Sequence, residues 1–317
     1  AFDIASEILE AEAKRNLEES QKVSLNVSEY EKFCDTFKFT ETPDQERVIR
    51  EVIADLLSDK PQDRLICGEV GFGKTEVALR ASFIVAQNDY QVCILAPTTV
   101  LAKQHFEVFK ERFSEFPYRI CLLTREQTKT EKAEIYKKIK ENHFSIIIGT
   151  HALFNKEISF KSLNLLIIDE EHKFGVRQKE QIRSLKNGIN VISLSATPIP
   201  RTLNLSLSKV RDISLITTPP TGRKSVKTIV SRYSKSLVFE AIQREFYRDG
   251  QVFYLLNNVS MLEEKKKEIS DRFPGKKIAF AHGQLRPKEL SKIMESFIRK
   301  EIDLLVCTTI IESGIDI

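Results

Sequence analysis

The sequence predicts an α/β protein built from two parallel-sheet domains, with a helical segment ahead of them. A chain of 317 residues is long enough for about two domains of roughly 150 residues each, and a hydrophobic content of 41% is ample for packed cores. From residue 64 onward, short apolar runs alternate with helical patterns, which is typical of a parallel sheet with helices on both faces. The alternation breaks at residues 217–224, where two prolines and a glycine end regular structure.

The expected elements follow in order along the chain. Apolar residues at helical spacing within 4–17 predict a partly amphipathic helix that packs against a neighbouring element. We therefore predict a helical lead-in at 1–38, a first α/β domain at 39–217 and a second at 218–317, the last incomplete at its C-terminus. The apolar runs that predict strands are 65–67, 92–96, 120–123, 146–149, 165–168 and 191–194 in the first domain, and 226–230, 252–256, 278–281 and 304–307 in the second.

Composition excludes some classes of protein. Lys and Arg number 49 against 45 Asp and Glu, and this surplus of +4 is too small to indicate a polyanionic partner. The five cysteines are widely spaced without a C-x-x-C pair, which favours buried free thiols in a reducing cytosol over disulfides or a zinc site. No apolar stretch reaches the ~18 residues of a membrane span, and the N-terminus lacks a signal-peptide pattern. We therefore predict a cytoplasmic protein without a membrane partner.

A phosphate-binding loop is predicted at residues 68–75, which match G-x-x-x-x-G-K-[ST] between an apolar run and a helical pattern. Gly68, Gly71 and Gly73 let backbone N–H groups turn toward a phosphate, and the N-terminus of the following helix favours an anion. Lys74 can reach the β and γ phosphates, and the Thr75 hydroxyl can ligate the Mg²⁺ that ATP carries. ATP or GTP binding is therefore the first functional prediction.

Two carboxylates follow the apolar run 165–168, at the strand edge where ligands bind in open α/β sheets. Asp169 would complete the magnesium shell begun by Thr75, and Glu170 would activate the water that attacks the γ-phosphate. Acidic residues after a strand are also common in plain loops. The assignment therefore depends on the pairing with the phosphate loop.

Together the two motifs resemble those of the superfamily 2 helicases and translocases, and further motifs appear in that family's order. Residues 42–45, after Phe39, are similar to the family's adenine-recognising element, in which Gln45 suits the paired donor and acceptor edge of adenine. The resemblance implies that His172 senses the γ-phosphate and couples to residues 195–197. The coupling residues are Ser195 and Thr197, and the later elements of the second domain add Gly314 and Asp316 to the nucleotide site.

The same resemblance implies contacts to DNA at residues 97–105, 148–151 and 308–316. Hydroxyls and backbone amides at strand ends suit phosphate contacts that hold a strand without recognising its sequence. A single threonine more often caps a helix, and only the family positions favour the contact. The implied DNA-binding residues are Thr98, Thr99, Gln104, Thr150, His151, Thr308 and Thr309.

Residues 169–177 and 196–203 look like those of the bacterial transcription-repair coupling factors. They are slightly less similar to the branched-DNA helicases that regress stalled replication forks, which usually have Gln where Glu171 stands. Lys173 replaces an arginine common in the coupling factors, which keeps the charge but loses bidentate hydrogen bonding.

The resemblance to the coupling factors implies two RecA-like domains that use ATP and Mg²⁺ to move along double-stranded DNA. RNA polymerase and a nucleotide-excision-repair protein would be partners, through domains not in this chain. The alternatives are a fork-regression helicase and a nucleotide-dependent DNA-binding module that does not hydrolyse ATP. The family's last arginine motif is not found before Ile317, so we expect weak hydrolysis by this chain.

Overall fold

The computed structural model describes residues 20–175, 178–179, 181–182, 188–197, 211–223 and 226–308. The chain divides into two compact units between Arg223 and Lys224, inside the segment where the prolines and glycine interrupt regular structure. None of the helices in the described part of the chain is long and apolar enough to cross a membrane. The five cysteines are free thiols; four are buried, as predicted, and Cys34 is half-buried.

The first unit contains a seven-stranded parallel sheet with the order β3-β4-β2-β5-β6-β1-β7. Every strand predicted for this unit is present. The structure adds β7, which the sequence analysis missed because its sequence alternates polar and apolar residues at the edge of the sheet. The strands are β1 (Asp63–Gly68), β2 (Gln91–Leu95), β3 (Ile120–Leu123), β4 (Ile146–Gly149), β5 (Leu163–Asp169), β6 (Asn190–Ser195) and β7 (Asp212–Ile216).

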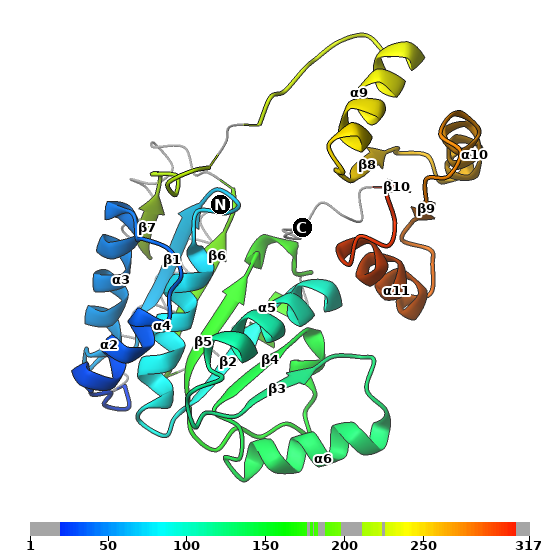
Figure 1. The fold of residues 1–317 in the computed structure, drawn as a ribbon. Helices are drawn as coiled ribbons and strands as arrows, with labels where there is room; N and C mark the ends of the chain where they lie inside the picture. Colours follow the sequence, from blue (N-terminus) through cyan, green and yellow to red (C-terminus); the bar gives the residue numbers. More distant parts are fainter. Residues whose placement is uncertain are drawn as a thin grey trace, which may run out of the picture. The chain divides into compact units, whose positions relative to one another are not determined.

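Helices cover both faces of this sheet, and α2, α3 and α4 lie together on one side of it (Figure 1). Successive residues of a strand therefore enter two different cores: Ile94 and Ile167 pack in one, and Cys93 and Leu166 in the other. The helices of this unit are α2 (Val27–Asp35), α3 (Pro43–Leu56), α4 (Lys74–Ala86), α5 (Thr99–Arg112) and α6 (Lys129–Lys140), with short 3₁₀ turns η1 (His151–Phe154) and η2 (Glu171–Lys173).

Part of the predicted helical lead-in is described, and it packs in the same core as Ile94 and Ile167. Phe33 of α2 is fully buried, and its ring stacks on that of Phe83 of α4 with the centroids 4.3 Å apart. The amphipathic residues within 4–17 lie outside the described residues. Helix α2 is thus an integral layer of the first unit.

The second unit contains a three-stranded parallel sheet with the order β8-β10-β9. The strand predicted at 226–230 is wrong, because this segment joins no sheet and Val226 and Val230 are 84% and 93% exposed. An apolar run forms a strand only where a neighbouring edge accepts its hydrogen bonds. The elements are β8 (Val252–Leu255), β9 (Ile278–Ala281), β10 (Leu304–Cys307), α9 (Lys235–Tyr247), η3 (Val259–Met261), α10 (Leu262–Arg272) and α11 (Pro287–Ile298).

Candidate functional site

The predicted phosphate loop connects the end of β1 to the start of α4. Gly71 and Gly73 have φ values of +80° and +79°, a conformation that L side chains rarely adopt. A Cβ atom on Gly73 would lie 2.2 Å from Nε2 of Gln45, whereas one on Gly71 would meet open space. Gly73 is therefore required both by its backbone angle and by the close approach of helix α3.

Lys74 is the first residue of α4, and its ammonium group points back into the loop. Its Nζ donates to the carbonyl oxygens of Gly68 and Glu69 at 2.5 and 2.9 Å. Burial lowers the pKa of Lys74, while Asp169 and Glu170 oppose that change. Thr75 follows on the same helical turn and is half-buried. The loop thus places an ammonium group and a hydroxyl at one helix N-terminus.

Gln45 joins helix α3 to the phosphate loop. Its Oε1 accepts the backbone N–H of Thr42 at 2.9 Å, closing a capping box, and its Nε2 donates to the carbonyl oxygen of Phe72 at 2.8 Å. Gln45 is buried, whereas Phe39, the other residue predicted to contact adenine, is 74% exposed. The adenine assignment stays a prediction; the structure adds that Gln45 supports the loop.

The two predicted carboxylates lie where β5 ends. Asp169 is buried, and its Oδ2 lies 2.7 Å from Nε2 of His105 on α5. Glu170 has a φ of 51°, a strained conformation for this residue type. Burial and then Asp169 raise the pKa of Glu170, against His172, Lys74 and the Ala196 amide. Both carboxylates favour the charged form of Lys74, although about a hundred residues of sequence separate them from it.

The predicted coupling residues lie beside Glu170, because β5 and β6 are neighbouring parallel strands. The Ala196 N–H donates to Glu170 Oε1 at 3.2 Å, and the hydroxyls of Ser195 and Thr197 are 2.8 Å apart. His172 Nδ1 lies 3.3 Å from Glu170 Oε2, without hydrogen-bond geometry. The structure therefore brings the residues predicted for hydrolysis and those predicted for coupling together at Glu170.

A partly buried ion cluster that includes Glu171 was not predicted. The guanidinium of Arg211, just before β7, donates to Glu171 Oε2 at 3.1 Å and to the Ser193 hydroxyl at 2.5 Å. It also lies 2.5 Å from Asp63 Oδ1 on β1. The cluster connects the turn after β5 to β1, to β6 and to the residue before β7. No sequence pattern indicated it, since its members come from four separate segments.

The residues of the first unit that were predicted to contact DNA differ in exposure. Thr98 caps α5, its hydroxyl accepting the Leu101 N–H at 3.2 Å, and Thr99 and Gln104 are half-buried on the same helix. Thr150 is fully buried. Threonine capping, the commoner role for a single threonine, is therefore observed at Thr98.

His151 is exposed and lies in a pocket of about 430 Å³ that the sequence analysis did not find. Arg125, Lys132, Tyr136 and Asn155 also line it. Burial lowers the pKa of His151, and the charges of Arg125 and Lys132 lower it further. The pocket is therefore a cationic environment next to one of the predicted DNA-contact elements.

In the second unit, the described part of the predicted site is Thr308. It follows β10, and its backbone N–H donates to the Ala281 carbonyl at 3.2 Å. Thr309, Gly314 and Asp316 lie outside the described residues.

Comparison with known proteins places the chain in a class. The DEAD/DEAH box helicase model matches residues 42–205, and the helicase conserved C-terminal domain model matches residues 235–317. The chain belongs to the DEAD/DEAH box helicase family.

The particular relatives are transcription-repair-coupling factors. That of Escherichia coli (strain K12) is 45% identical over 315 residues, covering 99% of this chain and 27% of the relative, and that of Bacillus subtilis (strain 168) is 47% identical with the same coverage. That of Buchnera aphidicola subsp. Baizongia pistaciae is 46% identical over all of this chain and 46% of the relative. The chain thus spans about a quarter to a half of these proteins. The resemblance predicted from the motifs is confirmed.

Solved structures support the fold. RecG bound to a three-way DNA junction matches with a TM-score of 0.80 and 32% identity over 97% of this chain and 41% of that chain. Dbp5 of S. cerevisiae bound to RNA and ADP BeF3 matches with a TM-score of 0.63 and 18% identity, over 86% of this chain and 72% of that chain, which concerns the fold alone. The predicted pair of RecA-like parallel-sheet domains is confirmed.

Proposed function

We propose that this chain is the ATP-driven motor of a double-stranded-DNA translocase of the transcription-repair coupling type. The observation that carries the proposal is the position of Lys74 at the mouth of a glycine-dependent phosphate loop, electrostatically coupled to the buried carboxylates Asp169 and Glu170. The relatives' names and their identity of about 45% over nearly the whole chain support it.

The donor groups fit Mg²⁺ bound together with ATP. The Thr75 hydroxyl and the Asp169 carboxylate are hard oxygen ligands of the kind that this ion prefers. An ion bound in this way takes its other ligands from phosphate and water. Such an ion would offset phosphate charge, and His105 would hold the Asp169 carboxylate in place.

Glu170 is the proposed base that orients the attacking water. One carboxylate oxygen is held by the Ala196 amide, and the other has no hydrogen-bond partner among the described residues. The strained backbone and the raised pKa are typical of a functional carboxylate. Because Ala196 lies between Ser195 and Thr197, the same contact offers a route by which hydrolysis could act on DNA binding.

DNA would bind through its phosphates. The pocket beside His151, which Arg125 and Lys132 make cationic, and the N-terminus of α5 at Thr98 and Thr99 supply groups that contact phosphate without recognising bases. We therefore expect binding that is independent of sequence and strongly weakened by salt. RNA polymerase and an excision-repair protein are proposed partners of the whole protein, supported by the relatives' name alone.

Nucleotide binding tests the proposal. Lys74→Ala should abolish binding of a fluorescent ATP analogue at concentrations that saturate the parent chain, whereas Lys60→Ala, on the surface ahead of β1, should not. Unchanged affinity in Lys74→Ala, with folding intact by circular dichroism, would contradict the assignment. If ATP and GTP compete equally well, Gln45 and Phe39 do not recognise adenine.

A branched-DNA helicase is the second candidate, favoured by the match to RecG over nearly the whole chain. The two can be separated with DNA of defined shape. Equal affinity for linear duplex and for a three-way junction supports the translocase, and a strong preference for the junction supports the helicase.

A further inference from the structure

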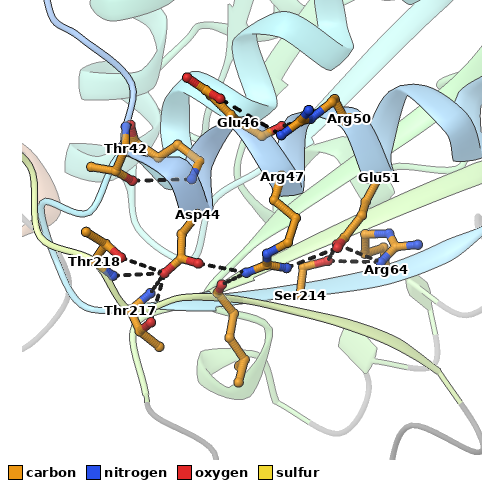
Figure 2. A network of polar contacts seen from close by, with 12 residues as sticks. Thr42, Asp44, Glu46, Arg47, Arg50, Glu51, Arg64, Ser214, Thr217 and Thr218 are labelled. Atoms are coloured by element: carbon orange, nitrogen blue, oxygen red, sulfur yellow. Dashed lines mark hydrogen bonds and ion pairs between the residues drawn. The ribbon is translucent and has the colours of Figure 1, made fainter.

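Residues 217–223 lead from β7 to the boundary between the two units, and we name them the linker segment. Its first two residues are held by one carboxylate. Oδ2 of Asp44 accepts the backbone N–H and the hydroxyl of Thr217, both at 2.8 Å, and those of Thr218, both at 3.0 Å (Figure 2). Four donors on one oxygen make this end of the linker segment firmly attached to helix α3.

Asp44 is itself fixed by a polar network along α3. Arg47 donates to the other oxygen of Asp44 at 3.1 Å and to the Leu215 carbonyl at 2.6 Å, and it pairs with Glu51 at 3.0 Å. Glu51 continues to Arg64 of β1 at 3.3 Å (Figure 2). The network therefore joins α3 to β1 and β7 and leaves Asp44 little freedom to move.

The last residue of the linker segment lies on the phosphate loop. The guanidinium carbon of Arg223 is 4.5 Å from the centroid of the Phe72 ring, and its Nη1 is 3.5 Å from Oε2 of Glu69. The side chains of Arg223 and Glu69 are 32% and 65% exposed. An ion pair this accessible to water is weak and can be exchanged for a stronger anion.

A hydrogen bond links the two places where the linker segment is attached, helix α3 and the phosphate loop. Gln45, the residue after Asp44, donates to the carbonyl oxygen of Phe72, so helix α3 and the phosphate loop are already joined beneath the linker segment. The charge of Arg223 also reaches the phosphate site, because it adds to burial in lowering the pKa of Lys74. Arg223 therefore stands close to where nucleotide phosphates would lie.

We propose that Arg223 is a further nucleotide-contacting residue, which exchanges Glu69 for the phosphates of a bound nucleoside triphosphate while Asp44 keeps the other end of the linker segment in place. The proposal rests on the proposed nucleotide site. A guanidinium binds the phosphates of a nucleotide more strongly than it binds a single exposed carboxylate, since the phosphates carry more negative charge. Nucleotide binding would then be transmitted directly to the segment that joins the units.

The test compares variants by affinity for a fluorescent ATP analogue. Arg223→Ala should weaken binding roughly tenfold, and Arg223→Lys should keep part of the affinity. Glu69→Gln should tighten binding about threefold by removing the competing anion, and this gain should vanish when combined with Arg223→Ala. Arg50→Ala is the matched control, because Arg50 lies on the exposed side of α3 and pairs only loosely with Glu46 at 3.9 Å.

Hydrogen exchange of the peptide covering residues 217–223 provides a readout that a purely structural role would not change. Nucleotide should slow exchange in the parent and in Arg223→Lys, and leave it unchanged in Arg223→Ala. Lys74-dependent binding with equal affinity in the parent and Arg223→Ala would overturn this inference alone. A parent chain that binds no nucleotide would overturn the proposed function and this inference with it.

Discussion

The two units follow the same alternation of strands and helices but bury their sheets differently. In the first unit, β2 and β4 are buried along their whole length. In the second, the central strand β10 is also buried, but the edge strand β8 alternates between half-buried and exposed residues, with Phe253 and Leu255 38% and 54% exposed. A sheet packed on both faces holds its strand ends rigidly, and those ends carry the phosphate loop and both carboxylates. We therefore expect the first unit to contribute most of the nucleotide affinity.

The largest effect should come from the core of the first unit. Phe33→Ala removes a fully buried ring stacked on Phe83, and we expect it to lower the free energy of unfolding by about 3–5 kcal/mol. Phe253→Ala in the second unit, whose ring is partly exposed, should cost about 1 kcal/mol. Calorimetry of both variants measures this contrast, and equal losses would contradict it.

Arg211→Ala should be next in size. It removes the cation that the buried Asp63 shares with the partly exposed Glu171, at a cost of about 3 kcal/mol. Arg50→Ala, on the surface of α3, should change stability by less than about 0.5 kcal/mol. Denaturant unfolding gives both values, and similar values for the two variants would show that the cluster is not stabilising.

The phosphate loop offers a matched pair of glycines. Gly73→Ala combines a positive φ with a clash against Gln45 and should cost about 2 kcal/mol and most of the nucleotide affinity. Gly71→Ala has the positive φ alone and should cost about 1 kcal/mol. Thermal unfolding and nucleotide titration test both. Equal behaviour would mean that helix α3 does not constrain the loop.

The smallest expected effect is on the stability of the fold at low pH. Burial alone would raise the pKa of Asp44, but hydrogen bonds from Thr217, Arg47 and Thr218 hold it well below its usual value. Asp44 therefore stabilises the fold above the unfolded-state pKa near 4, and this contribution is lost as pH falls below that value. Asp44→Asn should lower stability by about 1 kcal/mol at pH 7 and reduce the loss of stability below pH 4. Parallel pH dependence in the parent and the variant would contradict this.

Sequence periodicity predicted the strands of the first unit because their apolar runs are continuous, as they must be in a sheet covered on both faces. It failed at β7, where Ser214 interrupts the run, and at 226–230, which pairs with no strand in the described part of the chain. Apolar residues report that a segment can be buried. They do not report whether another strand lies beside it.

The same distinction separates the parts of the candidate site. The phosphate loop and the Asp169–Glu170 pair could be predicted from the sequence alone, because each is a pattern of residues that are neighbours along the chain. The contact of His105 with Asp169 spans 64 residues and that of Arg211 with Glu171 spans 40, so only the parallel sheet brings them together. The attachment of residues 217–223 to Asp44 and Arg223's place on Phe72 were likewise decided by tertiary structure. Such pairings depend on which strand ends lie at the same edge of the sheet, and the local sequence does not indicate this.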